Sequence, residues 1–386
     1  MNCTTRLCPG FVLCFGLLVG SSARADVIRD LGAGVSGLSM NNSGTVAGLR
    51  PGAGGARAFL DQGGNETLLS SGVSPIHVTA GGQVVNGNDA MAGNTSVNYI
   101  SRYSIHTYRG ILSDFTVASP VAANDQGQMV GVGYYYAKPS NYEAGYVYTP
   151  FTPQERGTVY ATVNPGNVRG LNMTAFGDVP GVKELYPNAI NNSGTIGGGQ
   201  LVETQSVVDG KTQDHFSTNA FVGAKDISAQ VGGNNSQVYA LNQAGDGAGK
   251  NFTTGEAFLY RADGVHVLPN LPGWNHYWSQ VNGINAADQI VGTAGGLAVL
   301  YDPKTNSTTD LNSFLPKASG WALTSAVSIN DNGQVLGYGT YNGESHGFLL
   351  DLNGSIQPAP IPEPATIGLF GLAIAALGLR HLKRRA

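Results

Sequence analysis

The chain has 386 residues, of which 12% are charged, and a formal net charge of -4 at pH 7. A chain of this length buries a sizeable core, and its weak negative charge creates no field that would attract nucleic acid. Its 56 glycines, together with many Asn, Ser and Thr residues, are typical of short strands joined by tight turns. The composition therefore predicts an all-β body and no nucleic-acid partner.

Residues 1–25 have the three parts of a secretory signal peptide. Arg6 supplies the charged start, residues 11–19 form the apolar run, and Ala23 and Ala25 form an A-x-A cleavage site. We therefore expect the protein to be exported and to lose this segment.

All the cysteines of the chain, Cys3, Cys8 and Cys14, lie inside the predicted signal peptide. The mature protein would then have no thiol for a disulfide, a thiolate metal site or a nucleophile. Lipidation of Cys14 is an alternative, but Leu13 precedes it where a small residue would be expected. The sequence predicts no metal and no cofactor.

The C-terminal end has three parts: a linker over 358–364, an apolar segment from 365 to 379, and a basic end. An apolar helix of that length spans about 22 Å, which is short for a hydrocarbon core of roughly 30 Å. Basic residues behind it fit the positive-inside rule, so we expect a transmembrane helix and basic tail over 365–386. The cytoplasmic basic residues would be Arg380, Lys383, Arg384 and Arg385.

Composition alone fits an ordinary C-terminal anchor, but the linker ends in Pro362-Glu363-Pro364. Two prolines prevent helix formation at the membrane edge and keep the backbone extended for a processing enzyme. The order of this motif, a short apolar helix and an Arg-rich end resembles the PEP-CTERM sorting signal of Gram-negative bacteria that make exopolysaccharide. The resemblance implies a membrane-embedded exosortase as partner, transient residence in the inner membrane, and delivery to the cell surface or extracellular matrix.

The body, residues 26–357, contains an internal repeat. Residues 189–198 read AINNSGTIGG, and residues 328–337 read SINDNGQVLG. Further copies centre on Asn41, Asn124, Asn242 and Asn285, and a degraded copy lies around 79–87. The count is about seven units, with six as the alternative.

Each copy predicts a hairpin, because Asn or Asp followed by Gly favours a turn between two alternating segments. A second hairpin follows in the better copies, with strands at 257–260 and 265–268 around a turn at 262–264. The spacing from Asn242 to Asn285 is 43 residues, close to the roughly 40–45 of a four-stranded propeller blade.

Two features of the repeat array need separate explanations: one long interval and one terminal segment. The interval from Asn124 to Asn191 is 67 residues, and we expect an inserted loop around 150–181. Residues 27–31 resemble the end of a unit, so we expect this strand to pair with the last blade and to close a ring.

The sequence thus predicts a β-propeller-like repeat array of about seven four-stranded blades, plus one C-terminal apolar helix, with a β-solenoid as the alternative. The units also resemble HAF-type extracellular repeats, which show Ala-x-x-Ile-Asn-x-x-Gly-x-Val-x-Gly followed by an Ala-Phe-Leu-like strand. Residues 189–198 and 257–259 carry this resemblance. It implies a propeller-like fold and no particular activity.

The Asn-rich turns invite a calcium-site hypothesis, because oxygen-rich turns coordinate that ion. Asn191-Asn192-Ser193-Gly194 has no acidic residue, so a repeated ion site would lack charge. The preference of Asn-Gly for tight turns explains the pattern better.

Aromatic residues cluster in the loop 271–278, and the segment 315–321 partly repeats its sequence. The candidate glycan-stacking residues in these segments are Trp274, Tyr277, Trp278 and Trp321. An indole face beside polar side chains suits the apolar face of a sugar ring. A Trp that recurs in two units is, alternatively, a wall between adjacent blades, because Trp is usually buried.

No residue pattern indicates catalysis. The histidines lack H-x-x-x-H spacing, and the acidic residues Asp125, Glu203, Asp226 and Glu256 would lie on different units. We therefore expect a non-enzymatic surface or matrix protein associated with exopolysaccharide and biofilm. The alternatives are a glycan-binding module and a polysaccharide-processing enzyme.

Overall fold

The computed structural model describes residues 27–69, 74–86, 103–108, 111–125, 128–137, 155–162, 172–175, 182–272 and 278–354. These residues form β-strands and one 3-10 helix, η1 (Leu311–Phe314), without any α-helix. The predicted all-β body is confirmed. The predicted signal peptide and the predicted C-terminal helix lie outside the described residues.

The described strands form seven antiparallel sheets, of which five have four strands, one has five and one has two. The first sheet contains β2 (Ser36–Met40), β3 (Thr45–Arg50), β4 (Arg57–Gln62) and β5 (Asn65–Leu68). The second contains β6 (Pro75–Val78) and β7 (Val84–Asn86). The third contains β8 (Tyr103–Tyr108), β9 (Ile111–Ala123), β10 (Gln128–Ala137), β11 (Glu155–Thr162) and β12 (Asn172–Ala175). The fourth contains β13 (Val182–Ile190), β14 (Ile196–Val208), β15 (Lys211–Val222) and β16 (Lys225–Asp226).

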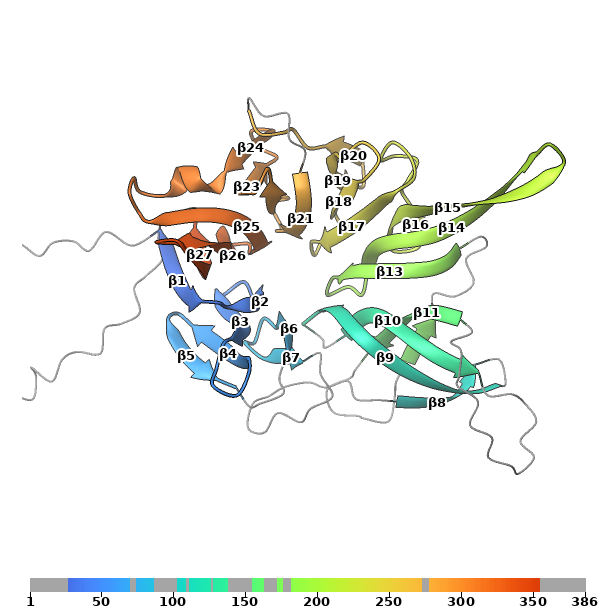
Figure 1. The fold of residues 1–386 in the computed structure, drawn as a ribbon, viewed down its shortest axis with the longest axis horizontal. Helices are drawn as coiled ribbons and strands as arrows, with labels where there is room; N and C mark the ends of the chain where they lie inside the picture. The colour runs from blue at the N-terminus through green and yellow to red at the C-terminus, as the bar shows by residue number, and fades with distance from the viewer. Residues whose placement is uncertain are drawn as a thin grey trace, which may run out of the picture.

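The remaining sheets continue in chain order around a common centre (Figure 1). The fifth contains β17 (Ser236–Leu241), β18 (Gly247–Asn251), β19 (Ala257–Arg261) and β20 (Gly264–Val267). The sixth contains β21 (Trp278–Ile284), β22 (Ile290–Ala294), β23 (Leu297–Asp302) and β24 (Ser307–Asp310). The seventh contains β25 (Trp321–Ile329), β26 (Gln334–Tyr341), β27 (Glu344–Asp351) and β1 (Ile28–Ala33). Several four-stranded antiparallel sheets in this arrangement are propeller-like, and the predicted fold class is confirmed to that extent.

The core lies between neighbouring sheets. Buried clusters join the first sheet to the second, the third to the fourth, and each later sheet to the next. A further cluster joins the seventh sheet back to the first, with Leu31, Leu336 and Phe59 among its buried members. Apolar side chains buried between these neighbouring sheets therefore hold them together.

One glycine of the repeat makes room for an aromatic ring in the next strand. Gly337 on β26 lies opposite Phe348 on β27, and a Cβ at Gly337 would lie 2.6 Å from the Phe348 ring. Gly249 and Phe258 form the same pair in the fifth sheet. The final Gly of the repeat and the Phe of the third strand thus pack together in both sheets.

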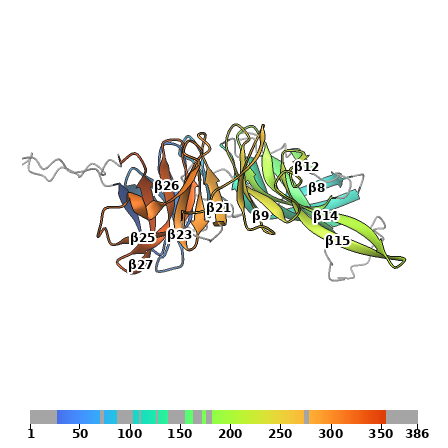
Figure 2. The same cartoon turned by 90° about the horizontal axis from the view of Figure 1, so that it is seen from above.

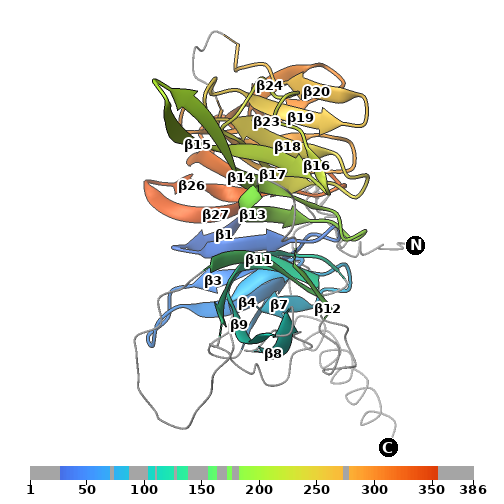
Figure 3. The same cartoon turned by 90° about the vertical axis from the view of Figure 1, so that its right-hand side faces the viewer.

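The N-terminal strand closes the ring of sheets. β1 pairs with β27 along Ile28 to Ala33, with Leu350 and His346 as the end partners (Figure 3). The backbone N–H of Asp351 also donates to the carbonyl of Val27 at 2.8 Å. The predicted pairing of the strand at 27–31 with the last unit is confirmed.

The predicted inserted loop around 150–181 is wrong in two places. β11 and β12 lie within it as the third and fourth strands of the ladder that starts at β9. Alternating residues such as Val159 and Ala161 pair with β10 there, so part of the long interval is regular sheet.

The fourth sheet has one extended hairpin. β14 and β15 run past their neighbours and project from the body (Figure 2). Val207 and Phe216 on this hairpin are 72% and 60% exposed. In the described part of the chain, no helix has the length and apolar character that a membrane span needs.

Candidate functional site

The central Asn of each repeat organises its own turn. The backbone N–H groups of Ser193 and Thr195 donate to Asn191 Oδ1 at 3.1 and 2.9 Å. The Asn330 oxygen accepts from Asn332 and Gln334 in the same way. The predicted turn role of the repeat Asn is confirmed, and its carbonyl oxygen is engaged by these backbone donors. Among the described residues, no group of three or more His, Cys, Asp or Glu is placed to hold a metal ion.

The amide nitrogen of the same Asn reaches the neighbouring unit, which the sequence analysis did not predict. Six of these nitrogens donate to the backbone carbonyl of the repeat residue in the next unit, at 2.8 to 3.5 Å. The donor and acceptor pairs are Asn41 to Thr79, Asn124 to Asn191, Asn191 to Asn242, Asn242 to Asn285, Asn285 to Asn330 and Asn330 to Asn41. We call these residues the asparagine ring.

The donors of the asparagine ring are buried, with exposed fractions of 2% to 6%. A buried amide that lost its partner would cost about 1–3 kcal/mol, so each bond fixes the relative position of two sheets. The longest bond, from Asn242, is supplemented by a 2.8 Å hydrogen bond from the same nitrogen to Asp288 Oδ1.

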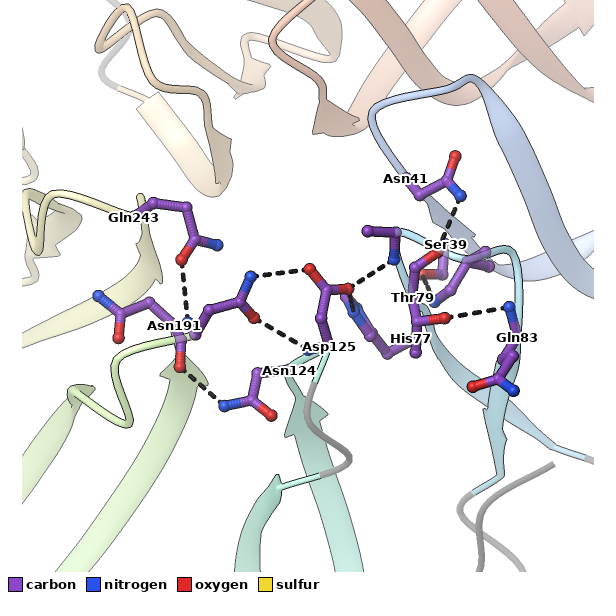
Figure 4. A network of polar contacts seen from close by, with 12 residues as sticks. Ser39, Asn41, His77, Thr79, Gln83, Asn124, Asp125, Asn191 and Gln243 are labelled. Carbon is purple, nitrogen blue, oxygen red and sulfur yellow. Dashed lines mark hydrogen bonds and ion pairs between the residues drawn. The ribbon is translucent and has the colours of Figure 1, made fainter. Parts of the chain in front are cut away.

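Thr79 occupies the repeat position in the degraded copy. Its Oγ1 accepts from the Gln83 N–H at 3.0 Å, as an Asn oxygen would, but it has no amide to donate to the next unit. Here the Ala80 N–H donates to Asp125 Oδ1 at 2.7 Å, and His77 Nε2 lies 3.1 Å from the same oxygen (Figure 4). A carboxylate and an imidazole thus replace the missing amide between the second and third sheets.

The carboxyl of Asp125 is held in its charged form. Its hydrogen bond with His77, supported by hydrogen bonds from Asn192 and Ala80, lowers its pKa from 3.8 to about 2, although burial acts in the opposite direction. The Asn192 amide donates to Asp125 Oδ2 at 2.7 Å. Asp125, which follows β9 of the third sheet, is therefore bonded to both the second and the fourth sheets.

A second set of bonds runs beside the asparagine ring, through the residue that follows each repeat position. The backbone N–H of Asp125 donates to Asn192 Oδ1 at 2.9 Å, and that of Asp331 donates to Asn42 Oδ1 at 3.1 Å. The backbone N–H of Ala286 likewise donates to Asp331 Oδ1 at 2.8 Å. Ala286 itself has no side-chain oxygen, so it cannot accept from the unit before it.

The candidate glycan-stacking residues lie in different surroundings. Trp278 is 1% exposed and packs in the core between the fifth and sixth sheets, as expected for a wall between blades. Trp321 is half-buried, and its ring stacks on Tyr341 with the centroids 5.0 Å apart. Trp274 and Tyr277 lie outside the described residues.

Two of the acidic residues singled out from the sequence, Asp125 and Asp226, are bonded within the fold. Burial raises the pKa of the Asp226 carboxyl, but hydrogen bonds from Ser228, Asn219 and Gln200 lower it overall. The prediction that these acidic residues lie on different units is wrong for one pair. Glu203 on β14 and Asp226 on β16 belong to the same sheet, because that sheet contains the extended hairpin.

The tail matches a known protein-sorting motif. Residues 360–385 match the model described as the PEP-CTERM protein-sorting motif, which includes Pro362, Glu363 and Pro364. No curated protein is similar to the chain by sequence.

Several solved structures are similar to the chain at low scores. A streptogramin B lyase has 10% identity and a TM-score of 0.35, with 84% of this chain and 97% of that chain covered. An inactive virginiamycin B lyase from Staphylococcus aureus with quinupristin has 9% identity and a TM-score of 0.34, with 84% and 98% covered. A mitotic checkpoint complex chain has 11% identity and a TM-score of 0.34, with 90% and 99% covered. At these scores the similarity establishes neither a shared fold nor a shared activity.

The motif implies export, a membrane-anchored intermediate and processing by an exosortase-type enzyme. The match at 360–385 therefore indicates that this chain ends in a PEP-CTERM protein-sorting motif and is an exosortase-sorted extracellular protein.

Proposed function

We propose that the protein is a non-enzymatic component of the cell surface or extracellular matrix, delivered by its tail and associated with extracellular polysaccharide. The observation that carries the proposal is the sorting motif at 360–385. The predicted signal peptide over 1–25 and the predicted transmembrane helix and basic tail over 365–386 complete the route. The body serves as a rigid, cysteine-free module.

The body supports this role through its construction. We infer a closed propeller of seven blades, because one repeat turn follows the innermost strand of each sheet and the turns are joined in sequence order. We also assign the units to the HAF-type extracellular repeats on their sequence pattern. Asp125 and Asp226 are engaged in hydrogen bonds within the fold, which favours a structural use of the acidic residues over a catalytic one.

Mass spectrometry of the protein from the cell surface or medium of its native host tests the sorting step. We expect an N-terminus at Asp26 and no peptide from the segment after Pro364. An intact C-terminus on the mature pool would contradict processing.

Replacement of Pro362 and Pro364 by alanine should trap the full chain in the inner membrane, since the motif presents an extended backbone to the processing enzyme. Cell fractionation measures the result. The matched control is Pro358→Ala, which changes a proline of the same linker outside the motif and should leave sorting intact. Surface delivery of the double variant would refute the role of the motif.

A second candidate function is glycan binding through aromatic stacking. The half-buried Trp321 favours it, because it lies at the start of β25 and stacks on Tyr341, so the two rings form an aromatic pair. If this function is correct, Trp321→Ala should abolish retention on polysaccharide from the host, while Trp278→Phe should not. Retention of the Trp321→Ala variant would exclude this surface.

A further inference from the structure

A cavity of about 420 Å³ lies at the seam where the ends of the described chain meet. Arg29, Asp30 and Gly32 of β1 line one side, and Arg50, Asp61 and Glu66 of the first sheet line the other. This volume lies within the roughly 300–1,000 Å³ of small-molecule sites. The cavity exists only when β1 has closed the ring, because each side belongs to a different sheet.

The guanidinium groups of the seam cavity keep unused donors. Arg29 Nη2 lies 3.2 Å from Asp61 Oδ1, and Arg50 Nη2 donates to the Leu31 carbonyl at 3.1 Å and contacts Glu66. Arg29 Nη2 is thus engaged by the Asp61 carboxylate, whereas Arg29 Nε and Arg50 Nε are buried and make no hydrogen bond within the described residues. Buried donors normally find partners, so these nitrogens require a ligand or ordered water.

The charges of the cavity select the kind of ligand. Arg29 is paired with Asp61 and Arg50 with Glu66, and the third carboxylate, that of Asp30, is bonded to His346 and to the Gly32 N–H. These paired charges leave no net positive field for a dianion, and a cation would meet both arginines. A sugar hydroxyl accepts from a guanidinium N–H and donates to a carboxylate, which satisfies both sets of groups at once. A neutral polyhydroxylated ring is the chemistry that fits.

We infer that the seam cavity binds one neutral sugar unit of an extracellular polysaccharide. Arg29 and Arg50 donate to its ring and hydroxyl oxygens, and Asp61 and Glu66 accept from its hydroxyls. The choice of a polysaccharide as the source rests on the proposed function, whereas the site itself rests on the cavity and its unused donors. Because the two sides belong to β1 and to the first sheet, the bound sugar would also stabilise the closed ring.

The test uses the full chain in detergent and a panel of glucose, galactose, mannose and N-acetylglucosamine, with inorganic phosphate as the charged comparator. Titration calorimetry measures affinity, and the nitrogen-15 NMR signals of the arginine Nε–H groups report the site. We expect at least one sugar to bind, to shift the signals of Arg29 and Arg50, and to raise the thermal unfolding midpoint. Phosphate should do none of these.

The variants Arg29→Lys and Arg50→Lys keep the charge but remove the fixed fork of donors, and should weaken sugar binding about tenfold each. Arg57→Lys is the matched control, since Arg57 lies on β4 outside the cavity lining and should not affect affinity. Tight binding of phosphate, binding unaffected by the two cavity variants, or no binding by any sugar would each overturn the proposal.

These outcomes are separate from the sorting proposal. Arg29→Lys should leave export and processing of the tail unchanged, so normal surface delivery with no sugar binding would reject the cavity alone. Failed delivery of the native chain would reject the sorting route while the binding result still stands.

Discussion

The steps around the asparagine ring are of two kinds, and their difference shows what the repeat Asn does. At six steps a buried amide ties one unit to the backbone of the next. At the seventh step, the Thr79 hydroxyl accepts a hydrogen bond within its own turn but has no amide to donate to the next unit. Asp125 joins the two units there through Ala80 and His77. The turn therefore needs an acceptor, while the link between units uses an amide N–H that reaches the carbonyl of the next unit.

The comparison separates two roles that overlap in one side chain. A hydroxyl oxygen can accept from a backbone donor of the turn, as Thr79 does from the Gln83 N–H. Only an amide supplies that oxygen and the outward N–H together. The Asn repeated along the chain is thus explained by contact between units as well as by turn preference.

The largest effect should come from Asn191→Asp, which keeps the turn acceptor and removes the donor to the Asn242 carbonyl at 3.1 Å. We expect a loss of about 2–3 kcal/mol in unfolding free energy, because a carboxylate would be buried against a carbonyl oxygen. Burial would raise the pKa of the new carboxyl, so the loss should shrink as pH falls and the acid becomes a donor. Denaturant unfolding at neutral and acidic pH measures both effects.

The control for this variant is Asn65→Asp, at an exposed position on β5. It should change stability by less than about 0.5 kcal/mol. Equal losses in the two variants would show that the asparagine ring does not bind the units together.

A smaller effect should come from Asp125 at the seventh step. Its folded pKa of about 2 lies below the ordinary 3.8, so its contribution is present above about pH 4 and is lost as pH falls toward 2. Asp125→Asn should cost about 1 kcal/mol at neutral pH after allowance for solvent screening. The difference in unfolding free energy between Asp125→Asn and the native chain should disappear near pH 2 in acid unfolding curves.

The control for Asp125→Asn is Asp209→Asn, in the exposed turn between β14 and β15. This variant should follow the native pH dependence. A constant gap between Asp125→Asn and the native chain at all pH values would rule out the charge of Asp125 as the cause.

Thr79→Asn should convert the seventh step to the common kind. The new amide would donate to the Asn124 carbonyl and add about 0.5–1 kcal/mol, the net value of one hydrogen bond. Thermal unfolding measures the gain in stability. In the double variant, Thr79→Asn should reduce the loss of stability that Asp125→Asn causes alone. Thr79→Val removes the turn acceptor without adding a donor, so it should destabilise the chain.

The smallest effect should come from Ala286→Asn, which restores an acceptor in the second set of bonds. Ala286 is exposed, so the new bond from the Gln243 N–H should add less than about 0.5 kcal/mol. Ala286→Leu has no acceptor and should give no gain. Comparable gains from both would assign the effect to packing instead.

Much of the fold could be predicted because the repeat is local. Turn residues such as Asn330 and Gly333, and the alternation of the strands that flank them, determine each hairpin, and the four-strand unit follows from its length. The strand at residues 27–31 could be assigned to the last sheet because it lacks its own unit. These features depend on neighbours in sequence.

The rest depends on groups that meet only in the folded ring. Nothing in the sequence around Asn191 shows that its amide contacts Asn242, and the pairing of Gly337 with Phe348 needs the register of the sheet. The burial of Trp278 depends on how closely the fifth and sixth sheets pack, which composition does not reveal. The seam cavity likewise brings together Arg29 and Asp61 from different sheets.

The pairing of β27 has a mechanical consequence. This strand carries the chain out of the body on its C-terminal side, and it lies between β26 and β1 in the seventh sheet. A pull on the tail side would load two antiparallel hydrogen-bond ladders along their length at once. The strand could not peel off bond by bond, as an edge strand does. Tension from the sorting end would thus be carried by both ladders before any blade opens.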